Sequence, residues 1–451
     1  MRTTVWSVLA GTILLPALAA AGPSAKVING NDNGPGSLRA ALMSGASTIV
    51  IDPTVDLIDL EAPLYYNGTT PLTINGSGQT IDGFGLGLEA MLTISHGADL
   101  SVRNLTFDAG GGDEDGPWER LVNEGGGKAI YVDIPADATG LVQLDLNNVT
   151  VLGTGNHGIH VSDCLLETED GGEDPDSCGD GNSGEGEGSA ASVSVRLNNV
   201  LVQRSGFGTQ DADGVRVDER GYGDIYLSAN NSTFDKVGAD GIELDEGGYG
   251  SVYVDVRHVS FTENGEYCLI NEFVPGDDCD DDGDPDVDDG FDIDEEGPGS
   301  VVGKIRNVNV IENYDEGLDF DEAGPGGADL SFIDVTSIDN VDEGIKVSEE
   351  DEGDNRARLV NVYETGDLEF EEAGDGSIEV SLNASWIGDD YKFVEENAGI
   401  VDLTINSSDI FDELEIEAVD PGPETIDAFL RARGSTIGEI DLVDGTSLLE
   451  Y

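Results

Sequence analysis

The chain has 451 residues, and its 94 acidic and 20 basic residues give a formal net charge of −74 at pH 7. A surface this negative excludes nucleic acids and anionic membranes as partners, because both would repel it. The same charge opposes compaction unless cations or salt screen it, so cations are the partners that the composition favours.

The N-terminus has the pattern of a secretory signal peptide over residues 1–21. Arg2 supplies a positive charge, residues 5–15 form an apolar stretch, and alanines occupy 19–21 as a small-residue cleavage site. A membrane anchor is the alternative, but the apolar run is short and Pro16 interrupts it. No later stretch is apolar enough to cross a bilayer, so we expect a secreted or cell-surface protein without membrane insertion.

Residues 22–47 are expected to form an N-terminal cap. Ser37 can cap a short helix that places Leu38, Ala41 and Leu42 on one face. A solenoid needs such a cap, because its open end would otherwise expose core residues and an unpaired strand edge.

From residue 48 to about residue 440, apolar and polar residues alternate in short runs that glycine-rich turns separate. This period of two is typical of strands with one face in a core. Glycine-rich, acidic segments at about 109–128, 164–190 and 266–290 indicate loop insertions. Residues 420–451 are expected to form the terminal coil and the C-terminal cap.

Five copies of one acidic phrase organise the centre of the chain. Each contains a glycine followed by apolar and polar residues in alternation, and these glycines are Gly214, Gly241, Gly290, Gly317 and Gly344. The step from one glycine to the next is constant, except that the step from Gly241 to Gly290 is longer because it includes an insertion. A second alternating strand follows each phrase. This constant step predicts an all-β solenoid, a right-handed parallel β-helix of about thirteen coils stacked about 4.8 Å apart, with the five glycines in one column.

The four cysteines lie in two local pairs at the acidic insertions. Cys164 and Cys178 bracket one insertion, and Cys268 and Cys279 lie in the other. Three connectivities are formally possible in a secreted protein, and two local disulfides that staple the loops are the simplest. A thiolate metal site is disfavoured because the spacings do not match those of zinc sites.

The second stapled loop contains a calcium-binding pattern. Residues 278–289 fit D-x-D-x-D-G-x-x-D-x-x-D, with a glycine at the sixth position for the sharp turn. The pattern resembles the calcium loops of thrombospondin type 3 repeats and EF-hands, although its last ligand is Asp and helices do not flank it. A merely acidic loop is the alternative. The expected Ca²⁺ ligands are Asp278, Asp280, Asp282, Asp286 and Asp289.

A second carboxylate group follows from the repeat itself. The positions two and four residues after each glycine carry acids in three successive copies, and stacked coils would bring them to one outer face. We call this set the carboxylate stripe: Glu243, Asp245, Asp292, Asp294, Asp319 and Asp321. Arg216 and Lys346 occupy the same position in the flanking copies. Like charges this close repel, so the stripe requires Ca²⁺ or screening salt, unless it is simply a solvated acidic face.

Several phrases of the chain resemble those of a known family. The opening GSLRAAL, the later TIDGFG, and the repeated phrases VRNLTF, LNNVTV, LNNVLV and IRNVNV resemble the bacterial secreted β-helix proteins of the pectin-lyase-like superfamily. The resemblance implies the fold and a bacterial source. It does not specify an activity, because this superfamily contains lyases, hydrolases, epimerases and adhesins.

The stripe supports two functions of different class. In the first, the protein is a monomeric, non-catalytic surface or structural module in which Ca²⁺ stiffens the coils or bridges to an anionic polysaccharide. In the second, which resembles polysaccharide lyases of this fold, Ca²⁺ would bind a polyuronate substrate and Arg216 or Lys346 would act as the base. We favour the first. Neither basic residue lies in a recognisable catalytic phrase, and the polygalacturonase-like phrases are out of order, with His157 expected in a turn.

Overall fold

The computed structural model describes most residues of the chain. They are residues 22–87, 89–111, 127–164, 188–209, 211–271, 287–396, 399–419, 426–443 and 446–450. The expected signal peptide lies outside them. Within them, no helix is both long and apolar enough to span a bilayer.

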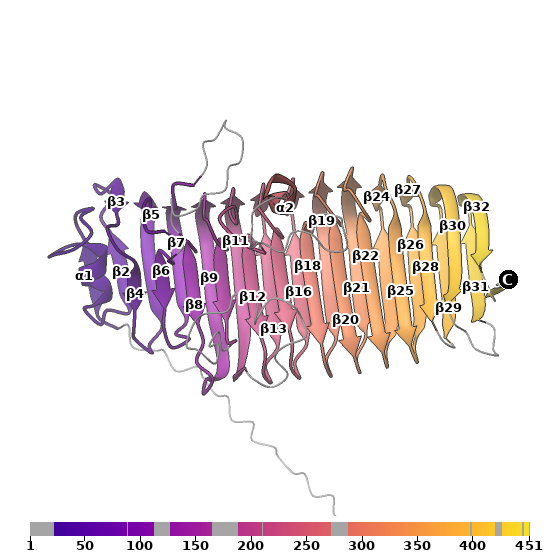
Figure 1. Ribbon diagram of the computed structural model, residues 1–451, viewed down its shortest axis with the longest axis horizontal. Helices are drawn as coiled ribbons and strands as arrows, with labels where there is room; N and C mark the ends of the chain where they lie inside the picture. Colours follow the sequence, from indigo (N-terminus) through magenta and orange to yellow (C-terminus); the bar gives the residue numbers. More distant parts are fainter. Residues whose placement is uncertain are drawn as a thin grey trace, which may run out of the picture.

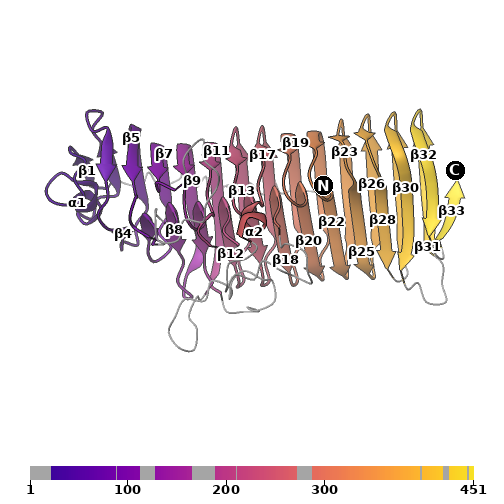
Figure 2. The same ribbon diagram turned by 45° about the horizontal axis from the view of Figure 1, so that its top comes forward.

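The described residues form one parallel β-helix, in which strands from successive coils pair side by side along a single axis (Figures 1 and 2). The pairings sort the strands into three faces, because each coil contributes up to three strand segments. This confirms the all-β solenoid that the repeat predicts.

The first face carries the strands of the five acidic phrases. Its members are β4 (Leu64–Tyr66), β6 (Leu92–Ile94), β8 (Ile130–Asp133), β10 (Ile159–Ser162), β12 (Val215–Glu219), β15 (Ile242–Glu246), β18 (Phe291–Glu296), β20 (Leu318–Gly324), β22 (Ile345–Asp351), β25 (Leu368–Gly374) and β28 (Tyr391–Glu396).

The second and third faces follow in each coil. The second has β1 (Ser24–Val27), β2 (Thr48–Ile51), β13 (Ile225–Asn230), β16 (Val252–Arg257), β23 (Asp354–Val360), β26 (Ser377–Asn383), β29 (Ile400–Asn406), β31 (Ile426–Arg433) and β33 (Thr446–Glu450). The third has β3 (Leu57–Asp59), β14 (Thr233–Asp235), β17 (Ser260–Thr262), β24 (Tyr363–Glu364) and β27 (Trp386–Ile387).

Some strands are long enough to belong to two faces. Those that bend from the second face into the third are β5 (Leu72–Asp82), β7 (Leu100–Asp108), β9 (Thr139–Leu152), β11 (Ala190–Gln203), β19 (Val301–Ile311) and β21 (Ala328–Ile338). Those that continue from the third face into the first are β30 (Asp409–Val419) and β32 (Thr436–Val443).

Every coil buries the alternate apolar residues of its strands in a continuous core. On the first face Phe291 pairs with Leu318, and Ile293 pairs with Phe320, all fully buried. Because these side chains point inward, the acidic residues between them must point outward.

The repeat glycines stack in one column, as their constant step in the sequence predicts. A Cβ built on Gly317 would lie 2.5 Å from the carbonyl oxygen of Gly344, and one on Gly290 would lie 2.4 Å from that of Gly317. Only glycine allows the coils to approach this closely at the turn.

The insertions leave the stacking of the coils intact. Ile242 of β15 pairs directly with Phe291 of β18, although the third acidic insertion, at about 266–290, lies between them in the sequence. That insertion also contains a short helix, α2 (Tyr267–Asn271), that the strand-like periodicity did not predict. Cys164 and Cys268 belong to the described residues, whereas Cys178 and Cys279 lie outside them, so both disulfide pairings stay predictions.

The N-terminal end has the expected helix, α1 (Leu38–Leu42). The backbone amide of Ala40 donates to the Ser37 hydroxyl at 3.2 Å, and Leu38, Ala41 and Leu42 are buried against the first coils. The cap predicted from the sequence is therefore present.

Candidate functional site

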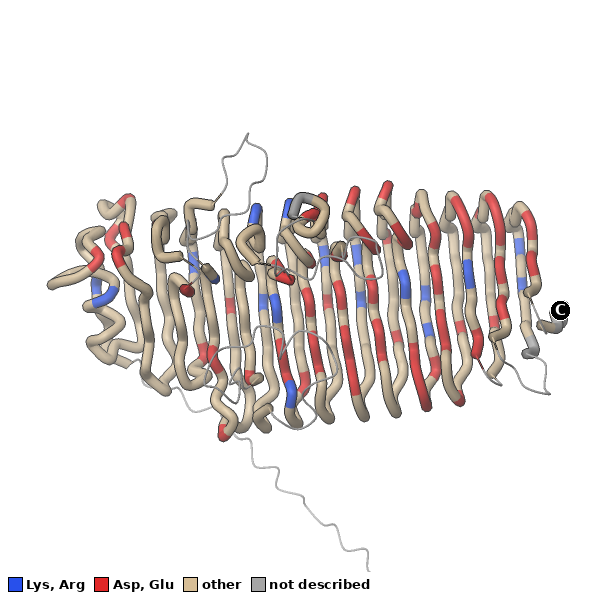
Figure 3. The backbone as a smooth tube through the Cα atoms, in the orientation of Figure 1, with Lys and Arg blue, Asp and Glu red and all other residues tan. Residues whose placement is uncertain are grey.

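The carboxylate stripe lies on β15, β18 and β20 in the predicted register. Glu243 pairs with Asp292 and Asp292 with Asp319, while Asp245 pairs with Asp294 and Asp294 with Asp321. Arg216 of β12 and Lys346 of β22 continue the first row at its two ends. Acidic residues accordingly recur at matching heights on successive coils (Figure 3).

These outward-pointing residues are much less exposed than a solvated acidic face would be. Asp245 is fully buried, and Glu243 and Asp319 are only 4% and 7% exposed. Burial, followed by the neighbouring carboxylates, raises the pKa of Asp292 and Asp319 well above its usual value. The stripe is therefore a cluster of mutually repelling carboxyl groups, of which Glu243, Asp245 and Asp319 are buried and Asp292, Asp294 and Asp321 are half-buried.

A column of acids in the turn before the first face adjoins the stripe, and the sequence reasoning missed it. We call it the turn column, and it comprises Asp213, Asp240, Asp289, Glu316 and Glu343, each directly before a repeat glycine. The amide of Asp240 donates to Asp213 Oδ1 at 3.1 Å, and the amide of Asp289 donates to Asp240 Oδ1 at 2.6 Å. The signal was visible, because every copy of the acidic phrase has an acid at this position.

The stripe and the turn column together form groups of carboxylates that can share a cation. In one group, oxygens of Asp289, Glu316 and Asp319 lie within 4.8 Å of one another, and all three residues are buried. Asp289 Oδ1 and Asp319 Oδ1 accept no hydrogen bond from the described part of the chain. Buried oxygens of this kind are costly unless a donor or a cation satisfies them.

Lys346 neutralises part of this group. Its Nζ donates to Glu316 Oε1 and to Asp319 Oδ2, each at 2.9 Å. One ammonium among three carboxylates leaves an excess of negative charge when all are ionised. A second group, formed by Glu243, Asp292 and Asp294, has the same 4.8 Å spacing of its oxygens.

The N-terminal end of the stripe is closed by arginine. Arg216 is 2% exposed, and its guanidinium donates to Asp218 Oδ1 at 2.7 Å, to Asp245 Oδ2 at 3.2 Å and also to Glu243. Burial opposes its charge, but Glu243 and the other carboxylates outweigh burial and hold the pKa of Arg216 well above its usual value. In the same way, Asp319 and Glu316 outweigh burial and raise the pKa of Lys346.

Two histidines adjoin this end. His160 pairs with Arg216 across the coils, and its Nε2 lies 2.5 Å from Asp218 Oδ2 while its Nδ1 lies 2.6 Å from Lys128 Nζ. Burial, followed by Lys128, lowers the pKa of His160 to about 3, so the ring is neutral at physiological pH. His157 lies in a turn, as expected, and accepts the backbone amide of Asp213 on Nδ1 at 2.9 Å.

A third acidic feature lies at the end of the first-face strands, on the inward side. We call it the glutamate ladder, and it comprises Glu219, Glu246, Glu295, Glu322, Glu349, Glu372 and Glu395. All are at most 1% exposed, and each has at least one carboxyl oxygen without a hydrogen-bond partner among the described residues. Each precedes a glycine by four residues, and Glu246 Oε1 accepts the amide of Gly250 at 2.9 Å. The phrase E-x-x-x-G could have revealed this ladder.

The loop at 278–289 lies largely outside the described residues. Asp278, Asp280, Asp282 and Asp286 are not among them, so their expected role as Ca²⁺ ligands stays a prediction. Asp289, the last residue of the pattern, is a member of the turn column instead.

Comparisons with known proteins add little detail. No family model matches the chain, and no curated protein matches it. The similar solved structures include the enzymatically active domain of tailspike protein 2 from bacteriophage CBA120, with 10% identity, 80% coverage of this chain and a TM-score of 0.40. They also include full-length tailspike protein 2 from an Escherichia coli O157:H7 bacteriophage, with 12% identity, 87% coverage and a TM-score of 0.38. The chain spans 44% and 39% of these two tailspike chains. The Streptococcus pneumoniae surface protein and adhesin PfbA matches with 8% identity, 90% coverage of this chain, 94% of its own and a TM-score of 0.29.

Proposed function

We propose that the protein is a secreted, non-catalytic module that binds Ca²⁺ along its first face. The observation that carries this proposal is the group of Asp289, Glu316 and Asp319, in which two buried carboxyl oxygens lack a donor among the described residues. Ca²⁺ takes six to eight oxygen ligands, and carboxylates are its preferred ones. Binding there would relieve the repulsion between stacked acids and so stiffen the coils.

The proposal extends to partners. Ca²⁺ held at the margin of the stripe could keep part of its coordination for an anionic polysaccharide. Asp292, Asp294 and Asp321 are the half-buried members of the stripe, so they are the ones that a ligand would reach. Binding of an anionic polysaccharide through such a bridge would require Ca²⁺.

Calorimetric titration of the EDTA-treated protein with Ca²⁺ tests the site. Asp319→Asn should remove one binding site and reduce the Ca²⁺-dependent rise in Tm, since a ligand at a hundredfold excess over its Kd stabilises the folded state by about 2.7 kcal/mol. Asp329→Asn is the matched control, because Asp329 is an exposed aspartate on β21. An unchanged stoichiometry in Asp319→Asn would contradict the proposal.

The same titration at low and at molar NaCl distinguishes Ca²⁺ binding from adaptation of the acidic surface to high salt. Screening alone would raise the Tm with NaCl and would show no saturable Ca²⁺ binding. The loop at 278–289 is a second proposed site, and Asp280→Ala combined with Asp282→Ala should remove one further equivalent of Ca²⁺ and leave the Asp319 site intact.

A calcium-dependent polyuronate lyase is the alternative, and the geometry of the two candidate bases disfavours it. A lysine or arginine side chain must be deprotonated before it can accept a proton from the substrate. The carboxylates around Arg216 and Lys346 hold the pKa of both above the usual values, so both stay charged. We expect no unsaturated product from polygalacturonate or alginate in the presence of Ca²⁺.

A further inference from the structure

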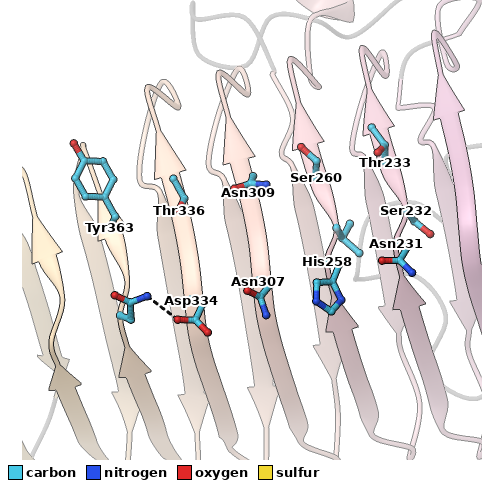
Figure 4. Close-up of a pocket in the computed structure, with 12 residues that line it drawn as sticks. Asn231, Ser232, Thr233, His258, Ser260, Asn307, Asn309, Asp334, Thr336 and Tyr363 are labelled. Atoms are coloured by element: carbon cyan, nitrogen blue, oxygen red, sulfur yellow. Dashed lines mark hydrogen bonds between the residues drawn. The ribbon is translucent and has the colours of Figure 1, made fainter.

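A groove with a volume of about 760 Å³ lies where the second face bends into the third. Five successive coils line it, and each contributes the residue at the bend itself, as Figure 4 shows for the labelled side chains. These bend residues are Asn231, His258, Asn307, Asp334 and Asn361. All five have a φ between 50° and 55°, which turns the backbone sharply at the same height in every coil.

A second row runs beside the first, two residues further along each coil (Figure 4). Its members are in register across the parallel ladder and are Thr233, Ser260, Asn309, Thr336 and Tyr363. Successive coils lie about 4.8 Å apart, so each row extends for about 19 Å along the axis.

The lining differs in chemistry from the carboxylate stripe. Asp334 is the only carboxylate among the lining residues, which include neither lysine nor arginine, and Asn361 Nδ2 donates to its Oδ1 at 2.6 Å. The side chains of Thr233, Asn307, Asn309 and Thr336 form no hydrogen bond with another described residue. Hydroxyl and amide groups can both donate and accept, so the groove offers a repeating set of neutral hydrogen-bonding groups.

An aromatic platform lies at one end of the second row. Tyr363 is 44% exposed, and its ring stacks on that of Trp386 with centroids 4.7 Å apart and planes inclined by 16°. Trp386 pairs with Tyr363 in the next coil and so continues the row. The exposed Tyr363 and the half-buried Trp386 together present an apolar aromatic surface beside the polar groups.

We infer that this groove binds an uncharged polysaccharide whose chain lies along the axis of the β-helix. Hydroxyl groups of a sugar chain match the amides and hydroxyls of the two rows, and the apolar face of a sugar ring matches the aromatic platform. A polymer fits better than a single sugar because the binding groups repeat at constant spacing over five coils. A polyanion is disfavoured by the net charge of −74.

The inference is independent of the proposed Ca²⁺ sites, because the groove uses other strands of each coil and contains one carboxylate. Its test is isothermal calorimetry of the mature protein with neutral hexasaccharides, namely α- and β-linked glucans, a mannan and an N-acetylglucosamine oligomer. EDTA and molar NaCl should leave the binding unchanged, and polygalacturonate serves as the charged comparison.

Three variants within the groove and one control outside it locate the binding. Asn309→Ala should weaken it by about threefold to tenfold, which corresponds to one neutral hydrogen bond. Tyr363→Ala should weaken it by about tenfold or more, whereas Tyr363→Phe, which keeps the aromatic ring, should retain most of the affinity. Ser331→Ala is the control, because Ser331 lies on the same strand as Thr336 but outside the groove.

Two results would overturn the inference. One is the absence of saturable binding to every neutral hexasaccharide in the panel. The other is binding that only polygalacturonate shows and that EDTA abolishes, since that result would assign the ligand to the carboxylate stripe. If the protein binds Ca²⁺ but no neutral glycan, this inference fails and the proposed function stands. If it binds a neutral glycan but no Ca²⁺, the proposed function fails and this inference stands.

Discussion

Replacing one rung of the glutamate ladder with glutamine should stabilise the protein in alkali and leave it unchanged in acid. Burial raises the pKa of Glu322 from 4.5 to about 7 and that of Glu295 to about 11. Between the usual value and the raised value, the folded protein holds a proton that the unfolded chain has released. The contribution of each such glutamate to the free energy of unfolding is therefore greatest below about pH 4.5 and is lost as the pH rises through the pKa of the folded state.

The magnitude follows from the shift. One pKa unit corresponds to about 1.36 kcal/mol, so ionising Glu322 in the folded protein costs about 3 kcal/mol above its folded pKa. Glu322→Gln removes this cost and retains a side chain of nearly the same shape. The variant should gain up to about 3 kcal/mol at about pH 8.5 and almost nothing at about pH 4.5.

Urea unfolding in EDTA, followed by circular dichroism at several pH values, measures the effect without Ca²⁺. Glu350→Gln is the control, because Glu350 is exposed on the neighbouring strand β22. If Glu322→Gln destabilises the protein at about pH 8.5, the ladder is ionised and depends on its charge. If the gain in the free energy of unfolding is the same at every pH, the cost of ionising Glu322 in the folded protein is not its cause.

Three further predictions concern the coil packing, the buried arginine and the cysteines. Gly317→Ala should destabilise the fold, because its Cβ would lie 2.5 Å from a carbonyl oxygen of the next coil, and thermal unfolding measures the loss. Arg216→Met should cost about 3–5 kcal/mol at neutral pH, because it removes the guanidinium that Asp218, Glu243 and Asp245 share, and the loss should shrink in acid as these groups gain protons. Peptide mapping without reduction should recover Cys164 linked to Cys178 and Cys268 linked to Cys279, and a linked peptide with Cys164 and Cys268 would contradict the two local loops.

The sequence predicted the features that depend on period alone. The constant step between repeat glycines determines which residues pair across coils. The pairing of Asp292 with Asp319 and the column of glycines could therefore both be predicted from the sequence. The burial of the stripe could not be predicted from the sequence, because it depends on what packs over an outward-facing side chain. The glutamate ladder was missed for a related reason, since glutamate at an inward position contradicts the binary pattern on which strand assignment relies.

The unbroken register of the first face also constrains how this chain can vary in length. Each coil contacts only its neighbours, so loss of one whole repeat would bring Asp292 beside Lys346 and leave every row of side chains aligned. A deletion one residue shorter than a whole repeat would shift the next first-face strand by a single position. Its acidic side chains would then point into the core. Stepwise duplication and deletion of complete coils is thus the route by which such a rod can lengthen or shorten while its surfaces persist.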